Sequence, residues 1–476
     1  MKSTMRSFFL AIVFLVGCTP ITPIPAVEIP SATPLPTHTR TARPTLTVMD
    51  IPSSTPTFDP AAIITVTPAE AAVCPKENPS LKPEIQFPRS REELLPESDP
   101  NLLLSMQKFL NRGGKIEFLL EEINNSYAAE NYRYQDVNAD QVPELLYWDA
   151  AYLSSIHIFY CHAGQYEIFT DKKFGVMSGW PRVIAIEDLN MNGLPDIVVE
   201  FGSCSGSGCW EYLVYEWDGN TFRNIAYDET RQNNKWPQTS GQKEFRITDI
   251  NNDGLQELVL TGDRLGPCCV GSMTPWRYKT VVYSWNGDIY AESYVAFDKA
   301  QYRFQAIQDA DREVGYGNYD IALAHYQEAI FNNELGWWTK ERRDYDVSLF
   351  HATFDVLITP TPSPYPKEDI TERPRLAAYA YYRIMLLHII RGFDLDASAT
   401  YHILQERFPA GDPGYPYVKM ATAFWETYYS THNLTNACGA AIEYAAAHPD
   451  ILIPLGSDYH GMQSHTYQPE DVCPFR

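Results

Sequence analysis

The stretch DINNDGLQELVL, residues 249–260, decides how the middle of this chain folds. It places oxygen-bearing side chains at its positions 1, 3 and 5, a glycine at position 6 and an acid at position 9, before an apolar run. This pattern is typical of a calcium loop between two helices, of a calcium loop inside a sheet, or of a polar turn. The helix-flanked site needs a bidentate carboxylate at position 12. Leu260 stands there, so the sequence excludes that alternative.

The same pattern occurs twice earlier in the chain. DVNADQVPELLYW begins at Asp136 and DLNMNGLPDIVVEF begins at Asp188, with the same oxygen-bearing positions and the same acid at position 9. Their twelfth residues, Tyr147 and Val199, again exclude a helix-flanked site. Because all three copies share one register, we interpret them as an internal repeat.

Short β-rich segments flank each loop. YRYQ, RVIAIE and EFRIT precede the loops, and ELLYW, DIVVEF and ELVLT follow them. A further apolar segment then meets a turn at Gly164, Gly219 or Gly287, and an aromatic residue follows each turn. Asp-Gly and Asn-Gly, at the last two turns, favour hairpins because these residues tolerate positive φ. We therefore predict four strands in each repeat, with the loop joining the first two.

A four-stranded repeat with an Asp-rich loop between its first strands resembles the FG-GAP or VCBS repeats of integrin-like β-propellers and of many bacterial surface proteins. The resemblance covers residues 131–298. In that family the loop binds calcium through positions 1, 3, 5 and 9 and through the carbonyl at position 7. The resemblance therefore implies these candidate ligands: Asp249, Asn251, Asp253, the Leu255 carbonyl and Glu257 in the third loop; Asp188, Asn190, Asn192 and Asp196 in the second; Asp136, Asn138, Asp140 and Glu144 in the first.

Two loops depart from the family pattern. The first has Gln141 where the turn favours glycine, and the second has Asn192 in place of a charged ligand. Because more carboxylates bind calcium more tightly, the third loop is the best candidate. The alternative for every loop is that its Asx side chains cap their own turn amides without a metal.

Three repeats are too few for the usual closed propeller. We expect a partial propeller or a compact β-domain, or a strand edge covered by the helical lead-in at 74–130. An uncovered strand edge invites aggregation, so some segment should hide it. Within the lead-in, Gly113 and Gly114 interrupt the helical spacing of apolar residues.

The hydrophobic period changes to a helical one after Phe297. GNYDIALAHYQEAI, from Gly317, resembles the second half of a tetratricopeptide repeat. A related pattern begins near Asn433, and another predicted helix pair lies between the two. The fold predicted for the whole chain is therefore α+β and multidomain, with antiparallel four-stranded β-repeats followed by an α-helical hairpin array. We assign 299–450 to this helical array, with an insertion at 337–372, and 451–476 to a C-terminal tail.

The N-terminus indicates export. A basic start and a short apolar stretch end in Leu15-Val16-Gly17-Cys18, which resembles the lipobox of bacterial lipoproteins. The resemblance implies a signal peptide at 1–17, removed before Cys18, and a lipid on the Cys18 thiol that anchors the chain to a membrane. Residues 18–73 are rich in proline and threonine, which predicts a disordered stalk. We therefore expect a lipid-anchored protein on the exported side of the bacterial envelope.

The charge and the cysteines narrow the functional classes. A formal charge of −23 argues against nucleic-acid binding and against direct adhesion to anionic lipid, because both need a basic surface. Nine cysteines less the lipidated one leave an even number in an exported chain, so disulfides are expected. Cys204 with Cys209 is the first candidate pair and Cys438 with Cys473 the second. Adjacent Cys268 and Cys269 are expected to pair with distant partners.

The sequence contains no phosphate loop, nucleophile elbow or zinc signature. Our first hypothesis is a non-enzymatic binding or scaffold module whose calcium-stabilised β-repeats and helical repeats present surfaces for an unidentified protein or glycan. The alternative is an extracellular hydrolase acting on polysaccharide through carboxylates in a cleft between the two halves. Two carboxyl groups roughly 5 to 10 Å apart in one open cleft would favour the hydrolase.

Overall fold

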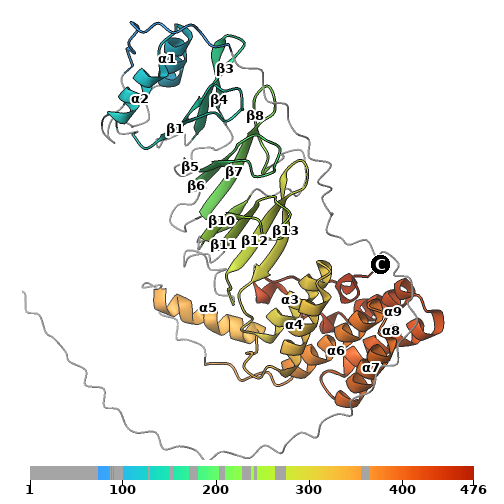
Figure 1. The fold of residues 1–476 in the computed structure, drawn as a ribbon. Helices are drawn as coiled ribbons and strands as arrows, with labels where there is room; N and C mark the ends of the chain where they lie inside the picture. The colour runs from blue at the N-terminus through green and yellow to red at the C-terminus, as the bar shows by residue number, and fades with distance from the viewer. Residues whose placement is uncertain are drawn as a thin grey trace, which may run out of the picture. The chain divides into compact units, whose positions relative to one another are not determined.

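The computed structural model describes residues 73–85, 87, 89, 100–126, 129–148, 155–170, 181–202, 209–227, 237–240, 244–262, 275–354, 364–461 and 463–475. The predicted signal peptide, Cys18 and almost all of the stalk lie outside these residues. Figure 1 shows a mixed α+β chain in which three antiparallel sheets precede a run of helices. Within the described ranges the sheets remain separate, and no closed barrel forms.

Each predicted repeat forms one sheet with its strands in chain order. The first contains β1 (Tyr132–Gln135), β2 (Glu144–Trp148), β3 (Ile156–His162) and β4 (Gln165–Thr170). The second contains β5 (Pro181–Glu187), β6 (Asp196–Gly202), β7 (Cys209–Trp217) and β8 (Phe222–Asn224), and β9 (Gln238–Ser240) also pairs with β7. The third contains β10 (Glu244–Thr248), β11 (Glu257–Gly262), β12 (Lys279–Trp285) and β13 (Tyr290–Phe297). Each candidate calcium loop therefore joins the first two strands of its sheet, as predicted.

The middle sheet is buried on both faces. Alternate side chains of a strand point to opposite faces. On β6, Ile197 and Val199 lie in a core shared with the first sheet, whereas Val198 lies in a core shared with the third. This double burial explains why DIVVEF is almost continuously apolar rather than alternating.

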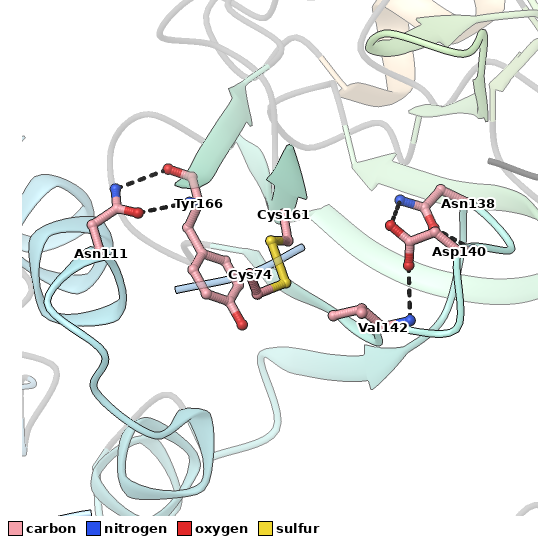
Figure 2. Close-up of a disulfide and its surroundings, with 7 residues drawn as sticks. All are labelled: Cys74, Asn111, Asn138, Asp140, Val142, Cys161 and Tyr166. Atoms are coloured by element: carbon pink, nitrogen blue, oxygen red, sulfur yellow. Dashed lines mark hydrogen bonds between the residues drawn. A yellow bond between two sulfur atoms is a disulfide. The ribbon is translucent and has the colours of Figure 1, made fainter. Parts of the chain in front are cut away.

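The lead-in packs on the outer face of the first sheet. Its helices α1 (Pro100–Asn111) and α2 (Ile116–Asn124) share a core with Leu145 and Phe159. Gly113 adopts a φ of 83° at the break between them. The Asn111 side chain accepts a hydrogen bond from the Tyr166 N–H at 2.7 Å and donates one to its carbonyl at 3.0 Å (Figure 2). The helical lead-in therefore satisfies backbone groups on β4, an edge strand, as an edge-covering segment should.

The helical half consists mainly of three consecutive helix pairs. They are α3 (Arg303–Gly315) with α4 (Tyr319–Phe331), α6 (Glu372–Ile390) with α7 (Asp394–Arg407), and α8 (Tyr415–Thr431) with α9 (Leu434–Ala447). The predicted insertion contains one further helix, α5 (Lys340–Phe354). On α4, the small and aromatic residues Ala322, Tyr326 and Ala329 are buried and pack in the core of the helical half.

The predicted C-terminal tail belongs to the helical core. It forms the short 3₁₀ turns η4 (Pro449–Ile451), η5 (Asp458–His460) and η6 (Pro469–Val472), and Leu455 and Val472 are fully buried. Cys473 is bonded to Cys438 on α9, the second of the two pairs named from the sequence. The tail therefore closes the helical array.

A buried ion pair joins the third sheet to the helical half. The Arg277 guanidinium, just before β12, contacts both carboxylate oxygens of Asp309 on α3, at 2.5 and 2.9 Å. Both side chains are buried. Nearby, the Tyr294 hydroxyl on β13 donates to Glu313 at 2.9 Å. These bonds fix α3 against β13.

Among the described residues, no helix combines the length and the apolar character needed to cross a membrane.

Candidate calcium loops

The three loops share one backbone conformation. Position 4 has a positive φ in each, at Ala139, Met191 and Asn252. Position 6 is also in the left-handed region, where the second and third loops have glycine and the first has Gln141, with a φ of 69°. A non-glycine residue is strained in this region. Gln141 therefore departs from the family pattern in residue type while preserving the turn.

The acids at positions 1 and 9 hold each loop closed in the same way. The position 1 aspartate accepts the N–H of position 6, and the position 9 acid accepts the N–H of position 2. The first set of bonds joins Asp136 to Gln141 at 3.0 Å, Asp188 to Gly193 at 2.9 Å and Asp249 to Gly254 at 3.0 Å. The second joins Glu144 to Val137 at 2.8 Å, Asp196 to Leu189 at 2.9 Å and Glu257 to Ile250 at 2.9 Å.

The Asx residues at position 5 cap their own turns. Asp140 accepts the N–H of Val142 at 2.7 Å, and Asn192 accepts that of Leu194 at 2.8 Å (the first is drawn in Figure 2). In the third loop Asp253 accepts the N–H of Leu255, at 2.8 Å. The Asx side chains therefore cap their own turn amides in all three loops, as the metal-free alternative requires. Only carboxylate oxygens that make no such hydrogen bond can indicate a bound cation.

Three carboxylate oxygens are left over. Asp136 Oδ1, Glu144 Oε1 and Asp196 Oδ1 are buried, and none has a hydrogen-bond partner among the described residues. Burying a carboxylate oxygen without a partner is strongly unfavourable unless a proton or a cation compensates its charge. The first and second loops therefore contain the buried, oxygen-only environment that a hard divalent cation prefers.

The electrostatics of these acids follow from their burial. Burial, with a smaller effect from the charges of Asp140 and Asp136, raises the pKa of Glu144 to about 9. Burial and the charge of Glu216 raise the pKa of Asp196 to about 8. Burial also raises the pKa of Glu257. The position 9 carboxylates are thus destabilised as anions in the absence of a counter-charge.

The loop with the most complete motif is not the most buried one. In the third loop, which has the most complete motif, Asn251 and Asp253 are exposed. The corresponding Asn138 and Asp140 of the first loop, and Asn190 of the second, are only 1 to 2% exposed. The second loop is covered in part by the third repeat, since Gln256 donates its N–H to the Leu189 carbonyl at 2.9 Å.

The second loop gains an acid that the motif does not contain. Glu216, at the end of β7, is buried, and its Oε2 accepts hydrogen bonds from the side-chain amides of Asn190 at 2.6 Å and Asn192 at 2.5 Å. The loop motif does not include Glu216, because this residue lies at the end of β7, a whole strand after the motif. The one signal in the sequence is a difference between repeats. Glu216 stands directly before Trp217-Asp218-Gly219, whereas the third repeat has Ser284 directly before Trp285-Asn286-Gly287.

The residue types fit calcium, although the side chains are not drawn together around one point. Across the parts of the chain that the structure describes, no three His, Cys, Asp or Glu side chains form a ready metal-binding group. Carboxylate and amide oxygens are the ligands that calcium takes in proteins. The second loop would hold calcium through Asp188, Asn190, Asn192 and Asp196, and the other loops through their corresponding residues.

Two pockets lie away from the loops. A groove of about 1090 Å³ is lined by residues of the first and second sheets, including Tyr132, Tyr134, Trp148, Arg182 and Trp210. A smaller pocket of about 350 Å³ lies in the helical half and is lined by acids among other residues; these acids are Asp369, Glu372, Asp412 and Asp450.

Among the described residues, one disulfide was not predicted. Cys161 on β3 is bonded to Cys74, in the segment before α1 (Figure 2). The candidate pair of Cys204 with Cys209 lies outside the described residues, since Cys204 and the Cys209 side chain are not described, and so do Cys268 and Cys269.

No protein-family model matches this chain, and no curated protein is significantly similar to it. The repeat and lipobox resemblances therefore depend on the motifs alone.

Proposed function

We propose that this chain is a non-enzymatic binding or scaffold module of the bacterial cell envelope, stabilised by calcium in its β-repeats and anchored by a lipid on Cys18. The observation that carries the calcium part is the set of buried carboxylate oxygens on Asp136, Glu144 and Asp196 that have no partner among the described residues. A bound cation would compensate their charge and stabilise the folded state over the unfolded one. The three loops occupy equivalent places in three sheets, so calcium has a structural role in this proposal.

The groove between the first two sheets supports the binding part of the proposal. It combines the rings of Tyr134 and Trp210 with the guanidinium of Arg182, which pairs with Glu200 at 2.8 Å. Aromatic and arginine side chains are enriched where proteins bind partners, because they bury a large area and still offer hydrogen bonds. The ligand class that fits this surface is a glycan or a segment of protein.

Thermal unfolding with calcium chloride and with a chelator tests the calcium part. At a free calcium concentration about 100 times Kd, one site adds about 2.7 kcal/mol to the free energy of unfolding. We expect a clear rise in melting temperature with calcium. The variant with Asp249→Ala and Asp253→Ala should lose part of it. Identical melting curves with and without chelator would refute the calcium assignment.

Affinity capture from envelope extract tests the groove. The full-length chain should retain a protein or glycan that the Tyr134→Ala, Arg182→Ala double variant does not retain. Tyr429→Ala, a change at an exposed residue of α8, is the matched control. Equal capture by all three proteins would exclude the groove as the binding surface.

The anchor has its own test. Changing Cys18 to serine removes the thiol that would carry the lipid, so the variant should leave the membrane fraction. Retention of Cys18→Ser in that fraction would point to a different anchor.

One observation favours a hydrolase as a second candidate, with its site inside the helical half and not in a cleft between the two halves. Burial raises the pKa of Glu372, in the acid-lined helical pocket, to about 8, so this carboxyl group holds a proton at neutral pH, as a general acid must. Its Oε1 also accepts the Trp338 N–H at 3.0 Å, which is a structural role. If the pocket is catalytic, Glu372→Gln should abolish hydrolysis of envelope polysaccharide. If the unaltered chain hydrolyses no envelope polysaccharide, the hydrolase is excluded and the binding module remains as the proposed function.

A further inference from the structure

The second loop lacks a carboxylate at position 5, and the structure brings one in from another strand. In the first and third loops, the position 3 asparagine donates its side-chain amide to the position 5 aspartate, at 3.0 and 2.9 Å. In the second loop position 5 is Asn192, and the amide of Asn190 donates instead to Glu216. Glu216 thus accepts the bond that the position 5 aspartate accepts elsewhere.

The strand register places Glu216 beside the acid at position 9. Ile197 on β6 pairs with Tyr215 on β7, so the next pair in the antiparallel register is Asp196 with Glu216. Both side chains are buried. Two carboxylates directly opposite each other on one face repel unless a proton or a cation lies between their charges. Arg223 lies 3.4 Å from Glu216 Oε1 and offsets part of this charge, and it also pairs with Asp288 at 3.3 Å.

A tyrosine from the next repeat closes this cluster. Tyr290, the first residue of β13, is fully buried, and its hydroxyl has no hydrogen-bond partner among the described residues. Tyr290 donates its N–H to the Ile225 carbonyl of the second repeat at 2.7 Å and lies in the same core as Leu189 of the second loop. Burial, and then the charges of Asp196 and Glu216, raise the pKa of Tyr290. Asp196 Oδ1 is likewise buried and has no hydrogen-bond partner among the residues that the structure describes.

We infer that Glu216 supplies the missing carboxylate of the second loop and completes a divalent-cation site there with Asp188, Asn190 and Asp196. The inference rests on the proposed calcium function and adds a ligand from outside the loop motif. It gives the second loop three carboxylates, Asp188, Asp196 and Glu216, which equals the number in each of the other two loops. It also links cation binding to the contact between the second and third repeats, through Tyr290.

Calorimetric titration of the full-length chain with calcium chloride tests the inference. Glu216→Gln keeps the shape of the side chain and removes its charge, so it should weaken calcium binding at the second loop by about tenfold or more, equivalent to at least about 1.4 kcal/mol. Glu200→Gln is the matched control, since Glu200 is a buried acid on the same sheet that contacts Arg182 and Tyr212. That variant should bind calcium like the unaltered chain.

A rescue variant separates ligation from a general effect on folding. Combining Asn192→Asp with Glu216→Gln returns the carboxylate to position 5, where the other two loops have it. We expect this double variant to recover most of the lost affinity. A Glu216→Gln protein that binds calcium with unchanged affinity, or a double variant with no recovery, would overturn the role of Glu216. Absence of calcium binding by the unaltered chain would instead refute the proposed function itself.

Discussion

The two halves of the molecule treat buried carboxylates differently. In the helical half, Asp311 accepts hydrogen bonds from the hydroxyls of Tyr326, Tyr379 and Tyr467, and the Arg383 guanidinium lies 3.1 Å away. In the β half, Asp196 faces another carboxylate and has a buried oxygen that no described residue hydrogen-bonds. The first acid is compensated entirely by side chains, whereas the second is not.

The carboxylate of the helical half is neutralised by side chains of the protein itself, whereas that of the β half needs a proton or a cation from solution. A buried ion pair with all its hydrogen bonds made requires nothing from solution. A buried acid without such partners must take up a proton or bind a cation. The helical half should therefore be indifferent to calcium, and the β half should respond to it.

Removing the internal cation of the helical half should have the largest effect. Arg383→Met removes a fully buried cation and leaves the partly buried Asp311 carboxylate without it, which should lower the free energy of unfolding by roughly 3 kcal/mol. Calcium should not restore it. Chemical denaturation with and without calcium measures both points. The control is Arg391→Met, whose partner Asp320 is exposed, and its effect should stay below about 1 kcal/mol. If calcium restored the stability of Arg383→Met, the claim that the helical half is indifferent to calcium would be wrong.

Glu372, a buried acid of the helical half, avoids its negative charge by binding a proton. Burial raises its pKa in the folded state to about 8, above the 4.5 expected for an unfolded chain. An acid with a raised pKa stabilises the fold at low pH, and this contribution is lost as pH rises through about 8. The unaltered chain should lose on the order of 2 to 4 kcal/mol between pH 5 and 9 through this group.

Glu372→Gln should remove that pH dependence, because glutamine cannot ionise. Glu368→Gln, at an exposed neighbour, is the control and should keep the dependence. Denaturation midpoints measured across this pH range would show the difference, and equal slopes for Glu372→Gln and the unaltered chain would contradict the assignment.

The smallest change in the free energy of unfolding is expected where a hydrogen bond joins two uncharged groups. Asn111→Ala removes both hydrogen bonds to the Tyr166 backbone and should cost about 1 kcal/mol or slightly more. Hydrogen exchange at the Tyr166 amide should become faster. Gln107→Ala removes a single bond to the same carbonyl and leaves that amide bonded, so its exchange should stay slow. Unchanged exchange in Asn111→Ala would show that α1 does not protect this strand edge.

Much of the fold follows from local pattern. The period of two around each Asp-rich loop, the Asp-Gly and Asn-Gly turns and the later helical period specify the three antiparallel sheets and the helix pairs, because backbone geometry fixes these periods. The pairing of Cys438 with Cys473 was likewise named from the sequence. The loop conformation follows too, since the same residue types recur at the same positions and cap the same amides.

Other features depend on tertiary packing. The bond of Cys74 to Cys161, the bonds of Asn111 to Tyr166 and the place of the tail in the helical core all join segments far apart in the chain, where no local spacing signals contact.

By itself, the sequence determined where the oxygen-rich loops lie and which strands and helices surround them. Tertiary structure alone decided which loops are buried and brought Glu216 to Asp196, across a strand pair that no motif records. The physical reason is that hydrogen-bonded turns are built from neighbours in sequence. Burial and charge compensation depend on whatever the rest of the chain places against them.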